Sequence, residues 1–163
     1  MSVTILATVM IMAAYFFVLY GAVGFIQDKR FFASAPKENQ AVIQDKKERF
    51  PGAHIVGWII EGIAVLLFIG AAVLAAWDGI KNDFGFFQFF VRFLIMLYCM
   101  EIYDIFFFDW YLLCRSNFFA HFYPEVKGAV GPQTFGYNKK THIRHFILYL
   151  PLCAAIAWIC TLF

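Results

Sequence analysis

Long apolar stretches dominate the pattern of hydrophobic and polar positions along this chain. A membrane-spanning helix needs about 20 predominantly apolar residues to cross about 30 Å of hydrocarbon. Four stretches approach or exceed that length, residues 3–26, 55–77, 86–114 and 146–163. The first carries no charged residue, and the second carries only Glu61. The pattern predicts an all-α integral membrane protein, a single membrane domain over residues 1–163 built as a four-transmembrane-helix bundle.

Two longer connecting segments, 27–54 and 115–145, separate these stretches. In the first, Ser34-Ala35-Pro36 resembles a helix start, because serine caps helices and proline is tolerated in the first turn. A short helix is therefore predicted within residues 37–49, which are rich in good helix formers. The second segment holds several Pro and Gly residues and six aromatic residues. It is predicted to be an irregular loop that folds back against the bundle or dips into the membrane interface.

Composition supports the membrane class. Hydrophobic residues make up 63% of the 163 residues and charged residues 15%, against about half and about a quarter in soluble domains. A chain this short cannot hide that excess in one core, since much of a small domain's surface stays exposed. The net charge of +2 is too small to indicate a nucleic-acid partner.

The distribution of Lys and Arg predicts the orientation, because cytoplasmic loops carry an excess of both. Segment 27–54 has six of them and segment 115–145 has five, whereas the connection 78–85 has only Lys81. Segments 27–54 and 115–145 are therefore predicted to be cytoplasmic, with both chain ends outside. Arg92 lies less than two turns into the third stretch and is expected to snorkel toward the outer interface.

Ionisable groups inside a membrane helix are costly and need a partner, water or a function. Glu101 and Asp104 lie about 60° apart on a helix, one turn from each other, and Asp109 lies about 80° from Glu101 on its other side. The chain's histidines all fall toward the cytoplasmic side, and His142 and His145 have the spacing that puts two residues on one helix face. Carboxylates and imidazoles are thus predicted to meet in one half of the bilayer.

Carboxylate and imidazole together are the ligands of Zn, Fe and Mn sites and also of proton relays. The predicted ligands of a divalent metal (Zn, Fe or Mn) are His142, His145, Glu61, Glu101 and Asp104. Glu101, Asp104, Glu61 and His145 are the candidate catalytic residues. The candidate binding residues are Asp109, His121, Tyr123 and Glu125. A plainer interpretation stays open, in which the histidines only flank a helix end beside Lys139, Lys140 and Arg144 and the deep carboxylates are structural.

Three functions are consistent with these residues. The first is a membrane-embedded enzyme acting on a lipid-like or amphipathic substrate at the cytoplasmic side, with the aromatic loop as a lid. The second is a proton- or cation-coupled transporter or channel subunit, which predicts a homo-oligomer because four helices make a thin pore. The third is a non-catalytic accessory subunit that pairs with a partner membrane protein. Membrane lipids are expected partners in each case.

Overall fold

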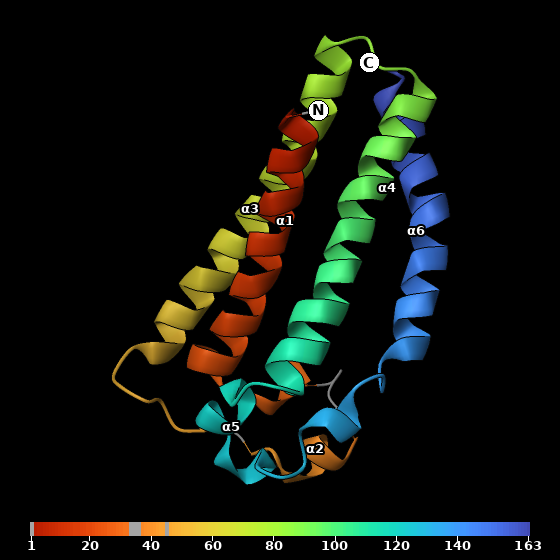
Figure 1. Cartoon of the computed structure of the whole chain (residues 1–163). Helices are drawn as coiled ribbons and strands as arrows, with labels where there is room; N and C mark the ends of the chain where they lie inside the picture. The colour runs from red at the N-terminus through yellow and green to blue at the C-terminus, as the bar shows by residue number, and fades with distance from the viewer. Residues whose placement is uncertain (1, 33–36, 45) are drawn as a thin grey trace. The chain divides into compact units, whose positions relative to one another are not determined.

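The computed structural model describes residues 2–32, 37–44 and 46–163, and these residues form helices and connecting turns without any β-strand (Figure 1). The long helices are α1 (Ser2–Gly21), α3 (Ala53–Lys81), α4 (Phe86–Tyr103) and α6 (Lys139–Cys160). Two π-helices continue long helices: η1 (Ala22–Ile26) follows α1, and η3 (Asp104–Leu113) follows α4. The short elements are η2 (Lys29–Phe32), α2 (Lys37–Val42), α5 (Phe118–Phe122), η4 (Pro124–Val126) and η5 (Pro132–Thr134).

Three helical stretches among the described residues are long and apolar enough to cross a membrane. They are Ser2–Ile26 with 25 residues, Ala53–Lys81 with 29 and Lys139–Cys160 with 22. These correspond to the first, second and fourth apolar stretches of the sequence. The third stretch, 86–114, forms α4 and η3, which carry four ionisable residues. The all-helical class is confirmed, whereas the number of spans and their orientation stay predictions.

The two connecting segments also contain helices. The predicted short helix in 27–54 is present as α2, which ends at Val42, well before residue 49. The predicted start at Ser34-Ala35-Pro36 lies outside the described residues. Segment 115–138 contains the short turns α5, η4 and η5, with left-handed glycines at Gly128 and Gly136. It is an irregular segment punctuated by single helical turns, since its Pro and Gly residues interrupt any longer helix.

The contacts divide the chain into two compact units. Unit 1 consists of Met1–Ala14, Val65–Tyr103 and Lys139–Phe163, and unit 2 consists of Tyr15–Ala64 and Asp104–Asn138. Unit 1 therefore contains the first part of α1, the last part of α3, and all of α4 and α6. Unit 2 contains the connecting segments together with η1, η3 and the first part of α3.

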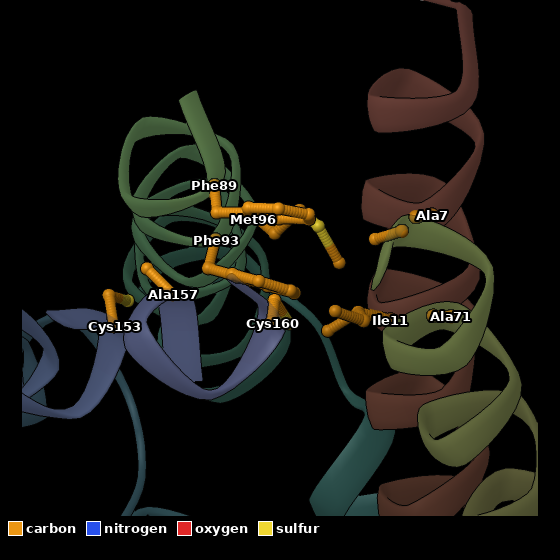
Figure 2. Packing of buried hydrophobic residues seen from close by; sticks show 10 residues of the cluster. Ala7, Ile11, Ala71, Phe89, Phe93, Met96, Cys153, Ala157 and Cys160 are labelled. Carbon is orange, nitrogen blue, oxygen red and sulfur yellow. The ribbon is translucent and has the colours of Figure 1, made fainter. Parts of the chain in front are cut away.

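The core of unit 1 is apolar and draws on all four of its helices. Phe89, Phe93 and Met96 extend from α4 toward the side chain of Ile11 on α1 (Figure 2). Small residues of α3 and α6 complete the cluster, namely Ala71, Ala75, Cys153 and Ala157. Because aromatic side chains oppose small ones, the helices can approach closely without a polar group in the centre.

Arg92 is buried in unit 1, at the end of α4 that follows the α3–α4 turn. Its guanidinium pairs with Asp78 at 2.7 Å, donates to the carbonyl oxygen of Ala75 at 2.6 Å and lies 4.2 Å from the ring of Phe84. Only 3% of the side chain is exposed. The expectation that Arg92 snorkels toward the membrane surface is therefore wrong, because a carboxylate on the neighbouring helix satisfies its charge inside the protein.

Unit 2 has its own core, in which both connecting segments pack against the end of the first helix. Val23 of η1 clusters with Ile43, Tyr123 and Val126. Close helix packing continues at Gly57 on α3, where an added Cβ would lie 2.6 Å from Ile26 Cγ1 and 3.1 Å from the backbone nitrogen of Ile26. Gly57 is therefore needed for the approach of α3 to η1.

Gly57→Ala is expected to destabilise the protein by about 1–3 kcal/mol, because the added methyl group meets backbone as well as side-chain atoms and forces a shift. The matched control is Gly62→Ala on the same helix, where an added Cβ meets nothing within 4 Å. That change should be neutral or stabilise by up to about 1 kcal/mol through helix propensity. Unfolding in mixed detergent micelles measures both, and equal effects of the two substitutions would contradict the close approach.

Candidate functional site

The candidate site lies in unit 1, between α4 and α6, which run side by side (Figure 1). Tyr98 on α4 sets their register. Its hydroxyl donates a hydrogen bond to the carbonyl oxygen of Phe146 at 3.0 Å, and the two rings meet edge to face with centroids 4.9 Å apart. This contact places the next turn of α4, which begins with Glu101, opposite the first three turns of α6.

Glu101 is the centre of the site. Its carboxylate is 2% exposed and contacts three side chains of α6. His142 Nδ1 lies 2.7 Å from Oε1, and His145 Nδ1 lies 3.1 Å from Oε1 and 3.2 Å from Oε2. The Tyr149 hydroxyl donates to Oε2 at 2.9 Å. Spacings of three and four residues place these three side chains on one face of α6.

The contacts explain how Glu101 can be buried. An isolated carboxylate in a low-dielectric interior is costly, and hydrogen-bond donors offset that cost. If Glu101 is ionised, both Nδ1 atoms carry the donated protons, so each neutral imidazole keeps a lone pair on Nε2. The same arrangement, a carboxylate that orients an imidazole, is common behind the ligands of metal sites.

Asp104, the first residue of unit 2 after the end of α4, adds a second carboxylate to this group. It is the first residue of η3 and follows Glu101 by three residues of uninterrupted helix, so the helix itself holds the two carboxylates close together. Oxygen and nitrogen atoms of Glu101, Asp104 and His142 lie within 4.8 Å of one another. The result is a buried Glu/Asp/His cluster that could bind a metal ion.

The distances from the Glu101 carboxylate to the two imidazoles can be compared with the spacing of ligand atoms around a metal ion. Two ligand atoms around one tetrahedral ion lie about 3.4 Å apart when both bonds are about 2.1 Å. The His145 distances from Glu101 approach that value, whereas the 2.7 Å distance from His142 is that of a hydrogen bond. Coordination by both Glu101 and His142 therefore requires the imidazole to move by less than 1 Å, within the reach of a side-chain torsion.

The π-helix η3 begins at the site. Ten consecutive residues in this conformation are unusual, because π-helices occur mostly as single turns and often at functional sites. The sequence prediction placed Asp109 by assuming 100° per residue, which does not apply to a helix with more residues per turn. Asp109 is buried within η3, and its predicted place in a stripe with Glu101 stays a prediction.

Glu61 belongs to unit 2, where its carboxylate packs against the end of α1. A Cβ added at Gly21 would lie 2.8 Å from Glu61 Oε1 and 3.3 Å from the carbonyl oxygen of Gly57, so the end of α1 lies close to α3 here. Glu61 and Glu101 belong to different units. The predicted convergence of Glu61 with the cluster therefore stays a prediction.

The remaining predicted binding residues lie in unit 2. His121 is exposed on α5 and meets the ring of Phe122 edge to face. Tyr123 is fully buried, and Lys46 lies over its ring and pairs with Glu125 at 2.7 Å. Burial raises the pKa of Glu125, but the hydrogen bond and positive charge of Lys46, together with backbone hydrogen bonds, outweigh burial and lower the pKa overall. Tyr123 and Glu125 thus join the two connecting segments to each other.

Sequence reasoning missed two residues of unit 1 that the structure places in polar contacts. Tyr149 lies four residues after His145, on the same helix face, and its ring stacks on the imidazole at 5.7 Å. That spacing was a usable signal, because it extends the pair of histidines by one turn. Asp78, the partner of Arg92, carried no comparable signal, since it lies on a different helix.

Tyr137 is a further aromatic residue of note in unit 2. Burial raises the pKa of its hydroxyl, and the negative charges of Asp109 and Asp104 act in the same direction. The aromatic segment before α6 therefore comes within electrostatic reach of these two carboxylates.

Comparisons of the chain with protein-family models, with curated proteins and with solved structures find no match. The class of the protein therefore follows from its fold and site. Over the residues that the structure describes, it is an all-helical protein with three helices that could cross a membrane, and it carries a buried carboxylate–imidazole cluster where α4 meets α6.

Proposed function

We propose that this chain is a membrane-embedded, metal-dependent enzyme that acts on a lipid-like or amphipathic substrate, with the cluster around Glu101 as its active site. The observation that carries the proposal is the contact of one buried carboxylate with two imidazoles, beside a second carboxylate at Asp104. This set suits Zn²⁺, or non-haem Fe or Mn. A bound divalent ion would supply Lewis-acid polarisation or a water of lowered pKa.

The proposal includes a fourth span formed by α4 and η3. These elements are helical over 18 and 10 consecutive residues, which together exceed the length needed to cross the hydrocarbon. Ionisable residues are tolerated at membrane depth when they face the bundle interior and are paired. Arg92 has Asp78 as its partner and Glu101 has the imidazoles, which supports α4 as a buried span.

The proposed orientation places segments 27–54 and 115–145 in the cytoplasm, from their excess of Lys and Arg. A cysteine introduced at the exposed Lys127 should be shielded from a membrane-impermeant maleimide in intact cells, whereas one at the exposed Lys81 should be labelled. Permeabilised cells should label both. The opposite pattern in intact cells would reverse the orientation and move the cluster to the other face.

Metal content and lipid turnover test the enzyme proposal. Elemental analysis of the purified protein is expected to find about one Zn, Fe or Mn per chain. Lipid extracts of cells that express the native chain should contain a product that is missing when Glu101→Gln is expressed at the same level. A metal-free protein, or identical lipid extracts, would contradict a metal-dependent lipid enzyme.

Proton or cation transport is the second candidate, and one observation favours it. The hydrogen bonds from His145 and Tyr149, together with the short contact to His142, satisfy Glu101 without an ion. A chain of carboxylate, imidazole and phenol is the type used in intramembrane proton relays. If this function is correct, oligomers reconstituted in vesicles should dissipate a pH gradient, and the metal-free protein should retain that activity.

A further inference from the structure

An apolar groove lies in unit 1, between the pair α4 and α6 and the parts of α1 and α3 that belong to the same unit. Its volume is about 320 Å³. Every lining side chain is apolar, and all four helices contribute, through Ile11, Ala72, Ala76, Phe93, Leu97 and Ile156. Figure 2 shows Phe93 and Met96, which also lines the groove, directed from α4 toward Ile11. The groove is open where Val73 and Ala72 are exposed.

Hydrocarbon is the occupant that this lining fits. Water needs two to four polar partners to occupy such a space, and the groove offers none from its side chains. An empty space would forfeit the dispersion contacts of its walls. Inside a bilayer, the hydrocarbon available to occupy the groove is the acyl chain of a membrane lipid.

The groove lies within one or two helical turns of the candidate site. Leu97 precedes Glu101 by one turn of α4, or about 6 Å along the helix axis. Ile156 follows Tyr149 by two turns of α6, or about 10 Å. His145 is 35% exposed and so can be reached by a ligand atom from outside the cluster. A lipid whose hydrocarbon chain occupies the groove would therefore bring its polar end toward the cluster.

The start of α6 favours a negatively charged head group. Lys139, Lys140 and Arg144 are all exposed in its first two turns. Basic residues near the membrane surface attract anionic lipids. The rise from Arg144 to Ile156 is about 18 Å, close to half of the roughly 30 Å hydrocarbon thickness. A lipid with its head beside Arg144 can thus reach the groove with its chain.

We propose that the groove binds one chain of an anionic phospholipid, with the head group beside Lys139, Lys140 and Arg144 and the head-proximal atoms near His145. This inference rests on the proposed function, for which it names the class of substrate. The apolar lining, the one or two helical turns between the groove and the cluster, and the basic first turns of α6 all indicate the same amphiphile.

The test uses the full chain in nanodiscs of phosphatidylcholine with a trace of phosphatidylglycerol that carries a diazirine near the end of one chain. Irradiation is expected to label Met96, Leu97 and Ile156. Ala76→Phe and, separately, Ala72→Phe fill the groove and should each lower this labelling about tenfold, since two methylenes of contact are worth that factor. Ala155→Phe, on the exposed side of α6, should leave it unchanged.

The alternative occupants give different results. Equal labelling in Ala76→Phe, Ala72→Phe and Ala155→Phe would mean that the probe only reports the lipid surrounding the protein, which overturns the proposal. Equal groove labelling by phosphatidylcholine with the same diazirine would overturn the anionic head group. A protein that lacks metal but shows groove labelling sensitive to Ala76→Phe would contradict the proposed function alone. A protein that binds metal but shows no groove labelling would contradict this inference alone.

Discussion

Glu101→Gln is expected to weaken metal binding at least about 100-fold, beyond the range seen when only an outer contact of a metal ligand is lost. The amide is neutral. Its N–H group would also face imidazole Nδ1 atoms that face a carboxylate oxygen in the native protein. Metal content should fall from about one ion per chain to a trace. Elemental analysis after purification measures the content, and competition with a chromophoric chelator measures the affinity.

Two variants frame this prediction. Tyr149→Phe removes only the hydroxyl that donates to Glu101 Oε2, and it should weaken metal binding about 10–100-fold by releasing the orientation of the carboxylate. The control variant is Glu125→Gln. The Glu125 carboxylate lies in unit 2 and pairs with Lys46, so its replacement should leave the metal content unchanged. Full metal occupancy in Glu101→Gln would show that the cluster is not the metal site.

Asp78→Asn is expected to destabilise unit 1 by about 3 kcal/mol, because it leaves the buried guanidinium of Arg92 without its counter-charge. Arg92→Met should cost less, since it removes the buried charge and keeps most of the side-chain volume in contact with Phe84. Unfolding in mixed detergent micelles measures both changes. A double-mutant cycle then gives the coupling between the two residues.

The chain contains a matched control for this ion pair. Arg30 and Asp28 form the same type of pair, but 82% of the Arg30 side chain is exposed. Exposed pairs contribute about 0–1 kcal/mol, since water and salt screen them. Arg30→Met should therefore be close to neutral. If Arg30→Met and Asp78→Asn had equal effects, burial would not be what gives the Arg92–Asp78 pair its strength.

The helices that are long and apolar enough to cross a membrane could be predicted from the sequence because hydrophobic length is a local property. Residues 3–26 and 55–77 have no more than one charge each, which suits helices of membrane-spanning length. The shared face of His142 and His145 was predictable for a similar reason. Helical spacing determines which residues are neighbours on one helix, whatever that helix packs against.

The π-helix and the boundary of α2 were not predictable in the same way. Propensity and hydrophobic periodicity assume an α-helix of 3.6 residues per turn, and nothing in Asp104–Leu113 departs from that composition. Because a π-helix has more residues per turn than an α-helix, the direction of the Asp109 side chain could not be obtained by assuming 100° per residue.

What the sequence determined by itself is an all-helical chain with long apolar stretches, deep carboxylates on the third of them and two histidines one turn apart on the fourth. Tertiary structure alone decided which groups meet: Glu101 with His142, His145 and Tyr149, and Arg92 with Asp78. It also decided that side chains of α1, α3, α4 and α6 line an apolar groove in unit 1. The reason is physical: spacing within a helix follows from covalent geometry, whereas the register between helices depends on how their side chains interlock.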